Sequence, residues 1–252
     1  MHFIFIIIFL FVQALSLKND RPTTQGINEY IKANKNALID EYTSYIKDTI
    51  YNDVYISTED FSKLNDYNKE TVGTTIFNQS YSYEIIINNE PKFAGYDLNL
   101  MSKSQKRTLT QFDQFVKATI FHELTHVYIN QCLLEMRMKN MYVDPEYDNN
   151  VHIYPNYEMK FGSEFIQEGI CQYVIEKKHE IVEYSNIFIP KTREELIDSS
   201  KTFEVKYQYS SYWLKNFLDS KGLKNGIFIL LGNRPPSYDE MINSKSFFDN
   251  LK

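Results

Sequence analysis

The stretch Phe121-His122-Glu123-Leu124-Thr125-His126-Val127 contains the pattern H-E-x-x-H within a run of residues that favours a helix. On an α-helix, His122 and His126 lie one turn apart, about 6 Å along the axis, and face the same way. Their imidazoles can therefore bind the same ion. Glu123 lies about 100° further round the helix, which keeps it out of the ligand set but within reach of a water at that ion. The pattern predicts a metal site on this helix.

Zinc suits these residue types. Two neutral imidazoles and one carboxylate leave a fourth position of a tetrahedral zinc site open for water. We therefore expect one Zn²⁺ ion. The alternative is a chance motif, in which a helix carries two partly buried histidines and a solvated glutamate.

The third ligand must come from elsewhere in the chain. One arrangement breaks the helix at a glycine three residues after the second histidine and places a third histidine three residues further on. These positions hold Ile129 and Cys132, which do not fit. The other arrangement takes a glutamate from a separate downstream helix. Glu168 is the candidate, and Gly169 beside it would let another helix approach closely. Glu164 is a rival, but its place at the expected helix start suits the helix dipole.

Composition limits the classes of function. The chain has 252 residues, of which 43% are hydrophobic and 15% aromatic, as expected of a globular protein. The net charge is −6, and the sequence contains no patch rich in lysine and arginine. We therefore expect no nucleic-acid partner. The sequence leaves the oligomeric state open.

The N-terminus has the features of a targeting segment. Residues 3–12 form an unbroken apolar run, which is too short for a membrane span of about 20 residues. An Ala14-x-Ser16 cleavage pattern follows, and charges begin at Lys18. We expect residues 1–16 to be a signal peptide and residues 17–252 to be a single secreted domain without stable membrane insertion. An uncleaved anchor is the alternative.

Two cysteines, Cys132 and Cys171, follow the two motifs. A disulfide between two helices and a pair of buried free thiols are both compatible with a secreted chain, because spacing alone does not decide connectivity.

Apolar periodicity and β-branched residues place strands early in the chain and helices late, which predicts an α+β fold. Residues 51–66 carry no clear pattern, and residues 141–161 read as a long loop. Strands are expected at 74–78, 82–88 and 93–101. Helices are expected at 27–50, from about 109 to 138, at 164–182 after a Ser163 cap, at 192–197, at 203–218 and after Ser237, where Glu240 would complete a capping box.

The two motifs together resemble those of a known family. F-H-E-L-T-H-V, followed by F-x-x-E-G-x-x-x-Y around Glu168, is similar to the gluzincin zinc peptidases of the peptidase-MA-like superfamily. Residues 207–218 are similar to the family's helix after the glutamate motif, and the likeness covers roughly residues 95–242. At Cys171 the family usually has a small residue.

The resemblance implies a zincin-like fold. In it, a small N-terminal mixed sheet packs on the H-E-x-x-H helix, and a mainly helical C-terminal half follows. An edge strand beside the cleft would pair with an extended substrate, and residues 93–101 are the candidate for that strand.

The resemblance also implies a secreted zinc metallopeptidase acting on a peptide or protein substrate. The zinc ligands would be His122, His126 and Glu168, and Glu123 would be the general base.

A tyrosine or histidine of such families donates a hydrogen bond to the oxyanion. Tyr207 best matches that position, followed by Tyr209. His152 and His179 receive no role. The alternative function is a secreted, catalytically inactive zinc-binding or protein-interaction module. Glu123 argues against that alternative, because metal binding alone does not need this residue.

Overall fold

The structure is a computed structural model that describes residues 24–63, 73–77, 82–89, 112–147, 157–179, 187–202 and 204–251. The expected signal peptide, the expected strand at 93–101 and His152 lie outside these residues, as does the side chain of His179. Within the described parts, no helix combines the length and apolar character needed to cross a membrane.

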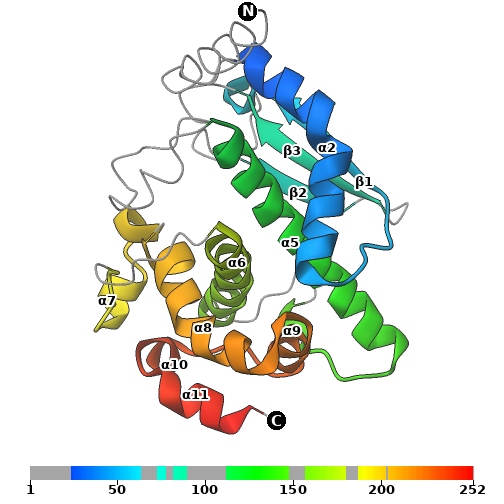
Figure 1. The fold of residues 1–252 in the computed structure, drawn as a ribbon. Coiled ribbons are helices and arrows are strands. Elements are labelled where there is room, and N and C mark those ends of the chain that lie inside the picture. Colours follow the sequence, from blue (N-terminus) through cyan, green and yellow to red (C-terminus); the bar gives the residue numbers. More distant parts are fainter. Residues whose placement is uncertain are drawn as a thin grey trace, which may run out of the picture. The chain divides into compact units, whose positions relative to one another are not determined.

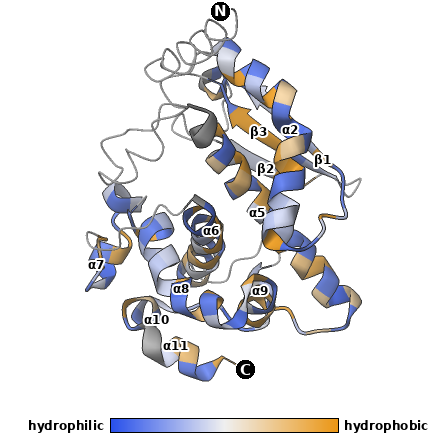
Figure 2. Cartoon of the chain, in the orientation of Figure 1, coloured by the Kyte–Doolittle hydropathy of each residue, from blue (hydrophilic) through white to orange (hydrophobic). Residues whose placement is uncertain are grey.

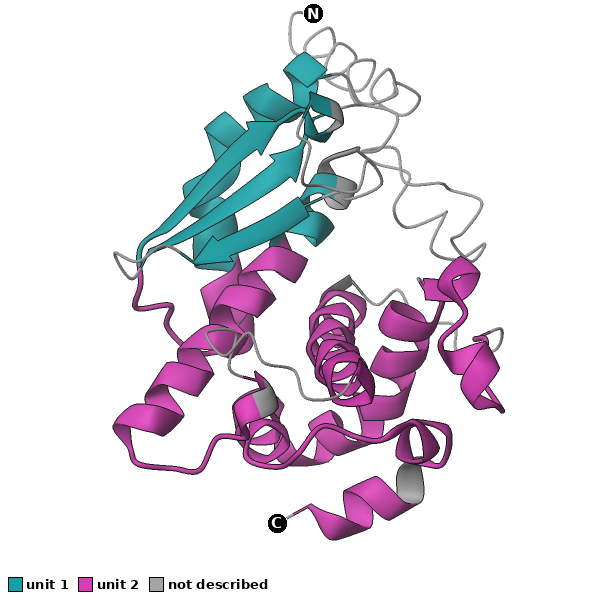
Figure 3. Ribbon diagram, turned by 180° about the vertical axis from the view of Figure 1, so that it is seen from behind, with its two compact units in different colours: residues 1–41, 53–120 teal, residues 42–52, 121–252 magenta. Residues whose placement is uncertain are grey.

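The chain forms two compact units (Figure 3). Unit 1 comprises residues 1–41 and 53–120, and unit 2 comprises residues 42–52 and 121–252. Helices α2 (Thr24–Ile46) and α5 (Phe112–Met138) each begin in unit 1 and end in unit 2.

Unit 1 contains a three-stranded mixed sheet in the order β1-β3-β2. The strands are β1 (Val54–Glu59), β2 (Gly73–Phe77) and β3 (Tyr83–Asn88), and the short helix η1 (Phe61–Lys63) follows β1. β3 pairs in parallel with β1 and antiparallel with β2, so that Ile85 faces Ile56 on one side and Thr75 on the other. The central strand is hydrophobic and buried, and α2 and the first turns of α5 lie on one face of the sheet (Figures 1 and 2).

The strands predicted at 74–78 and 82–88 are confirmed within one residue. β1 lies in the stretch for which the sequence made no prediction. It is an edge strand with one buried residue, Ile56, so it lacks the alternating apolar pattern of a half-buried strand. The predicted helix at 27–50 is confirmed up to Ile46 and stops there, because Lys47 adopts a positive φ of 55°.

Unit 2 is helical in its described residues. After α5 its elements are η2 (Pro145–Tyr147), α6 (Tyr157–His179), α7 (Arg193–Leu196), η4 (Ser199–Lys201), the π-helical segment η5 (Glu204–Tyr209), α8 (Ser210–Lys221), α9 (Leu223–Leu231), α10 (Tyr238–Ile242) and α11 (Ser244–Asn250). Helix α6 packs against α8 through Phe165. The centroid of its ring lies 5.5 Å from that of Trp213. The ring centroid of Trp213 in turn lies 4.4 Å from that of Phe248 in α11. The predicted α+β class is confirmed.

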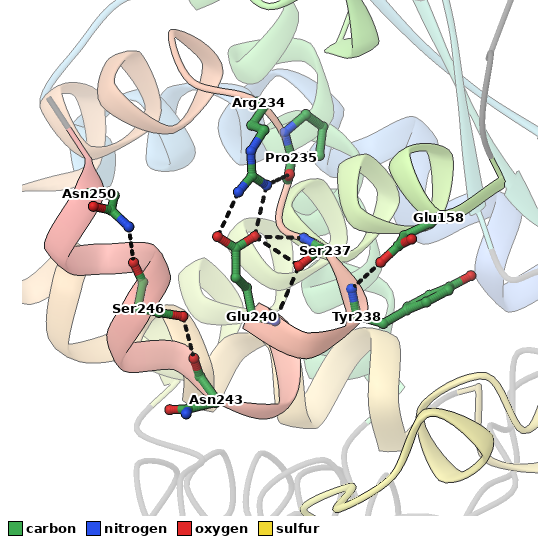
Figure 4. A network of polar contacts seen from close by, with 9 residues as sticks. All are labelled: Glu158, Arg234, Pro235, Ser237, Tyr238, Glu240, Asn243, Ser246 and Asn250. Carbon is green, nitrogen blue, oxygen red and sulfur yellow. Dashed lines mark hydrogen bonds and ion pairs between the residues drawn. The ribbon is translucent and has the colours of Figure 1, made fainter.

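The start of α6 corrects the sequence prediction. The helix begins at Tyr157, not after Ser163, which is buried inside it. Tertiary contacts set this start. The Glu158 carboxylate accepts a hydrogen bond of 2.6 Å from the backbone N–H of Tyr238 (Figure 4). Gly162 allows the Pro236 carbonyl so close that a Cβ atom would lie 2.4 Å from it.

The C-terminal capping box is confirmed. Ser237 and Glu240 cap each other's backbone at the start of α10, and Arg234 binds both oxygens of the Glu240 carboxylate at 2.7 Å (Figure 4). This helix is not the last one, because α11 follows it directly. The predicted helix at 192–197 is confirmed as α7, and the one at 203–218 consists of η5 and most of α8.

Candidate metal centre

The H-E-x-x-H segment lies in the part of α5 that belongs to unit 2. Its other positions are core, since Phe121, Leu124, Thr125 and Val127 are fully buried. Thr125 donates to the Phe121 carbonyl at 2.7 Å and accepts a hydrogen bond of 3.0 Å from the Tyr42 hydroxyl. The helix is therefore held on its buried faces. The side chains of His122 and His126 remain 13% and 19% exposed, so an ion can reach them.

The two histidines meet as the spacing predicts. Their Nε2 atoms lie 3.2 Å apart, and the ring centroids are 5.0 Å apart with the rings steeply inclined.

Glu168 joins them from α6. Its Oε2 atom lies 3.0 Å from Nε2 of His122 and 3.6 Å from Nε2 of His126. In a tetrahedral site with zinc bonds of about 2.0–2.2 Å, neighbouring donor atoms lie about 3.3–3.6 Å apart. The three donor atoms are thus spaced as ligands of one zinc ion would be, with adjustments of a few tenths of an ångström.

The electrostatics of this group favour a cation. Burial alone would raise the pKa of Glu168, but the imidazoles of His126 and His122 hold that pKa well below its ordinary value. Burial would lower the pKa of His126, whereas Cys171 and Glu168 raise it well above its usual range. The carboxylate is therefore ionised and stabilises positive charge among the imidazoles.

Glu123 follows His122 on the helix and is only 6% exposed. Its charge helps to raise the pKa of the Cys171 thiol, which places its carboxylate within electrostatic range of that residue.

Tyr207 is carried by the π-helical segment η5, and its ring centroid lies 5.7 Å from that of the His122 imidazole. Tyr209 is engaged elsewhere, because its hydroxyl donates to the backbone carbonyl of Met241 at 2.6 Å. Of the two predicted tyrosines, Tyr207 is the one whose ring lies beside the His122 imidazole.

Gly169 determines how closely η5 and α8 approach the glutamate helix. A Cβ atom at this position would lie 2.8 Å from Cβ of Ser210 and 2.9 Å from Cδ1 of Leu214, distances too short for real contacts. The predicted close approach at this glycine is confirmed. Short π-helical segments are frequent at functional sites, and this one directly precedes Ser210.

The rival ligand Glu164 forms ion pairs with Lys206 at 2.5 Å and with Lys160 at 3.7 Å. Its carboxylate is therefore neutralised by two lysines, as suits a partly exposed residue in the first half of the helix.

The sequence did not predict that Cys171 lies beside His122 and His126. Both cysteines are free and buried, so the disulfide alternative is not formed. Donor atoms of His122, His126 and Cys171 all lie within 4.8 Å of one another, and burial raises the pKa of the Cys171 thiol to about 11. The missed signal was its spacing. Cys171 follows Glu168 by three residues, which places both on the same face of a helix.

No protein-family model matches this chain, and neither a curated protein nor a solved structure is significantly similar to it.

Proposed function

We propose that this chain is a secreted, zinc-dependent peptidase of zincin-like fold that hydrolyses peptide bonds in peptide or protein substrates. The observation that carries the proposal is the convergence of the donor atoms of His122, His126 and Glu168 within 3.0–3.6 Å. These residues come from two helices, and their chemistry and spacing fit one zinc ion. Secretion rests on the apolar segment at residues 3–12 and the cleavage pattern after it.

His122, His126 and Glu168 would hold the zinc ion, which when bound would act as a Lewis acid and would lower the pKa of a bound water to about 7. Glu123 lies next to His122 in the chain and is largely shielded from solvent. Its carboxylate accepts the proton of the attacking water and then returns it to the leaving amine of the substrate. The Tyr207 hydroxyl donates a hydrogen bond to the oxyanion that develops on the scissile carbonyl.

Glu123 favours catalysis over simple metal binding. Metal binding by His122 and His126 does not need a carboxylate beside them, whereas hydrolysis needs a base at that place.

The test measures zinc content and peptidase activity on the same preparations of the mature wild-type protein and the Glu123→Gln variant. Glutamine keeps the shape of the side chain but cannot accept a proton. We expect one zinc per chain in both proteins and a loss of activity of about 10²–10⁴-fold in the variant. A library of unstructured peptides serves as substrate.

Two results would overturn the proposal. Absence of stoichiometric zinc from wild-type protein prepared with Zn²⁺ would exclude the metal site. Equal activity in wild type and variant would exclude Glu123 as the base. Glu164→Gln is the matched control, since this glutamate lies on α6 and pairs with lysines.

A further inference from the structure

The site contains one donor more than an open zinc centre needs. Cys171 lies on α6 one turn after Glu168, is fully buried, and presents its Sγ atom to the two histidines. The donor atoms of Cys171, His122 and His126 lie within 4.8 Å of one another. The thiol is therefore part of a cluster of three metal-ligating groups rather than an isolated cysteine.

Thiolate is a strong ligand for zinc, and mixed sets of cysteine and histidine are common around this metal. With bonds of about 2.3 Å to sulfur and 2.1 Å to nitrogen, the two donor atoms of a tetrahedral site lie about 3.6 Å apart. The separations in the cluster are at most 4.8 Å, so none exceeds this tetrahedral spacing by more than about 1.2 Å. Rotation of the Cys171 side chain about its Cα–Cβ bond moves Sγ by more than this distance.

We propose that Cys171 is a fourth protein ligand, so that His122, His126, Glu168 and Cys171 together close the metal site in its resting state. This inference rests on the proposed zinc site and concerns its regulation. A zinc site with four protein ligands is closed, whereas a catalytic site keeps one position open. The resting protein is therefore latent, and hydrolysis requires Sγ to leave the ligand set.

The proposed latency device lies within the two helices that carry the metal site, α5 and α6. Cys132, the other cysteine, does not take part in the cluster. It interacts with Tyr128 and lies near the charges of Lys224 and Glu135. The two buried thiols thus form a natural pair for comparison, one at the proposed site and one outside it.

The experiment is X-ray absorption spectroscopy at the zinc edge of the wild-type protein loaded with Zn²⁺ alone. We expect one sulfur scatterer at about 2.3 Å together with nitrogen and oxygen scatterers at about 2.0–2.2 Å. Cys171→Ala should lose the sulfur scatterer and retain zinc, whereas Cys132→Ala should keep both. Far-UV circular dichroism and the melting temperature report whether each variant folds. The wild-type spectrum shows whether sulfur is a zinc ligand even if Cys171→Ala does not fold.

Activity provides a second readout. If closed molecules outnumber open ones by ten to one or more, opening the site raises the activity of Cys171→Ala by about tenfold or more over wild type. A wild-type zinc protein with only nitrogen and oxygen scatterers would overturn the proposal. So would equal, measurable peptidase activity of the wild type and of a folded, zinc-loaded Cys171→Ala.

The outcomes separate this inference from the proposed function. Failure of both the wild type and Cys171→Ala to bind zinc would exclude the proposed zinc peptidase. A sulfur scatterer in the wild type, with no detectable peptidase activity in either the wild type or Cys171→Ala, would support the cysteine ligand and exclude the peptidase.

Discussion

The Oε2 atom of Glu168 lies 3.0 Å from the Nε2 atom of His122, although the two residues belong to different helices. The H-E-x-x-H motif supplies two donors on one helix turn, and this contact brings the third from α6. The site therefore depends on the packing of unit 2 as much as on the motif.

Glu168→Gln should weaken zinc binding by more than about 100-fold, because removal of a mere outer-shell partner of a ligand already costs about 10–100-fold. Competition between the protein and a chelator measures the affinity. Glu164→Gln, whose parent carboxylate pairs with Lys206, should leave it unchanged. Equal affinities in the two variants would exclude Glu168 as a ligand.

Tyr207→Phe should lower kcat by about 10²–10³-fold and leave KM and zinc content nearly unchanged, because the hydroxyl acts only on the developing oxyanion. Steady-state kinetics at saturating zinc provide the measurement. Tyr212→Phe is the matched control, since Tyr212 is an exposed tyrosine on α8. A change confined to KM would argue for substrate binding instead.

Gly169→Ala should destabilise the protein by about 1–2 kcal/mol. The added Cβ would overlap Ser210 and Leu214, and such overpacking costs about 1–3 kcal/mol, partly offset by the higher helix propensity of alanine. Urea denaturation measures the free energy of unfolding. A variant as stable as wild type would mean that η5 and α8 can move away from α6 at little cost.

Asp219 should contribute pH-dependent stability. The ammonium groups of Lys177 and Lys215, each 2.6 Å away, and the Tyr173 hydroxyl hold the pKa of Asp219 well below its usual range. A carboxylate with a lowered folded-state pKa stabilises the fold above its unfolded pKa of about 3.9 and loses that contribution as the pH falls through the folded value.

Asp219→Asn should therefore cost about 1 kcal/mol at pH 7, and the difference from wild type should shrink below about pH 4. Urea titrations at a series of pH values follow this change. Asp249→Asn, at an exposed aspartate of α11, is the matched control. A difference that persists unchanged at low pH would show that charge is not its source.

The two cysteines should not be joined by a disulfide in the purified protein, and both should react slowly while it is folded. Both are buried, and burial raises the pKa of Cys132 to about 12, so little thiolate is available to a reagent. In denaturant without reductant, an aromatic disulfide reagent should titrate two thiols per chain. Titration of none before reduction would reveal a disulfide.

The sequence by itself determined the local parts of this protein. His122 and His126 meet because helical periodicity places residues four apart on one face, and no distant contact is needed for that. The strands with apolar patterns, the capping box of Ser237 and the α+β class followed from the same short-range rules.

Only the tertiary structure decided the rest. Glu158 binds the backbone of Tyr238 and starts α6 earlier than Ser163, a contact that no local pattern records. The convergence of Glu168 and Cys171 on the histidines depends on how α6 packs, and Gly169 permits that packing by lacking a Cβ atom. Periodicity fixes which residues share a helix face, whereas the distances between helices come from the packing of their side chains.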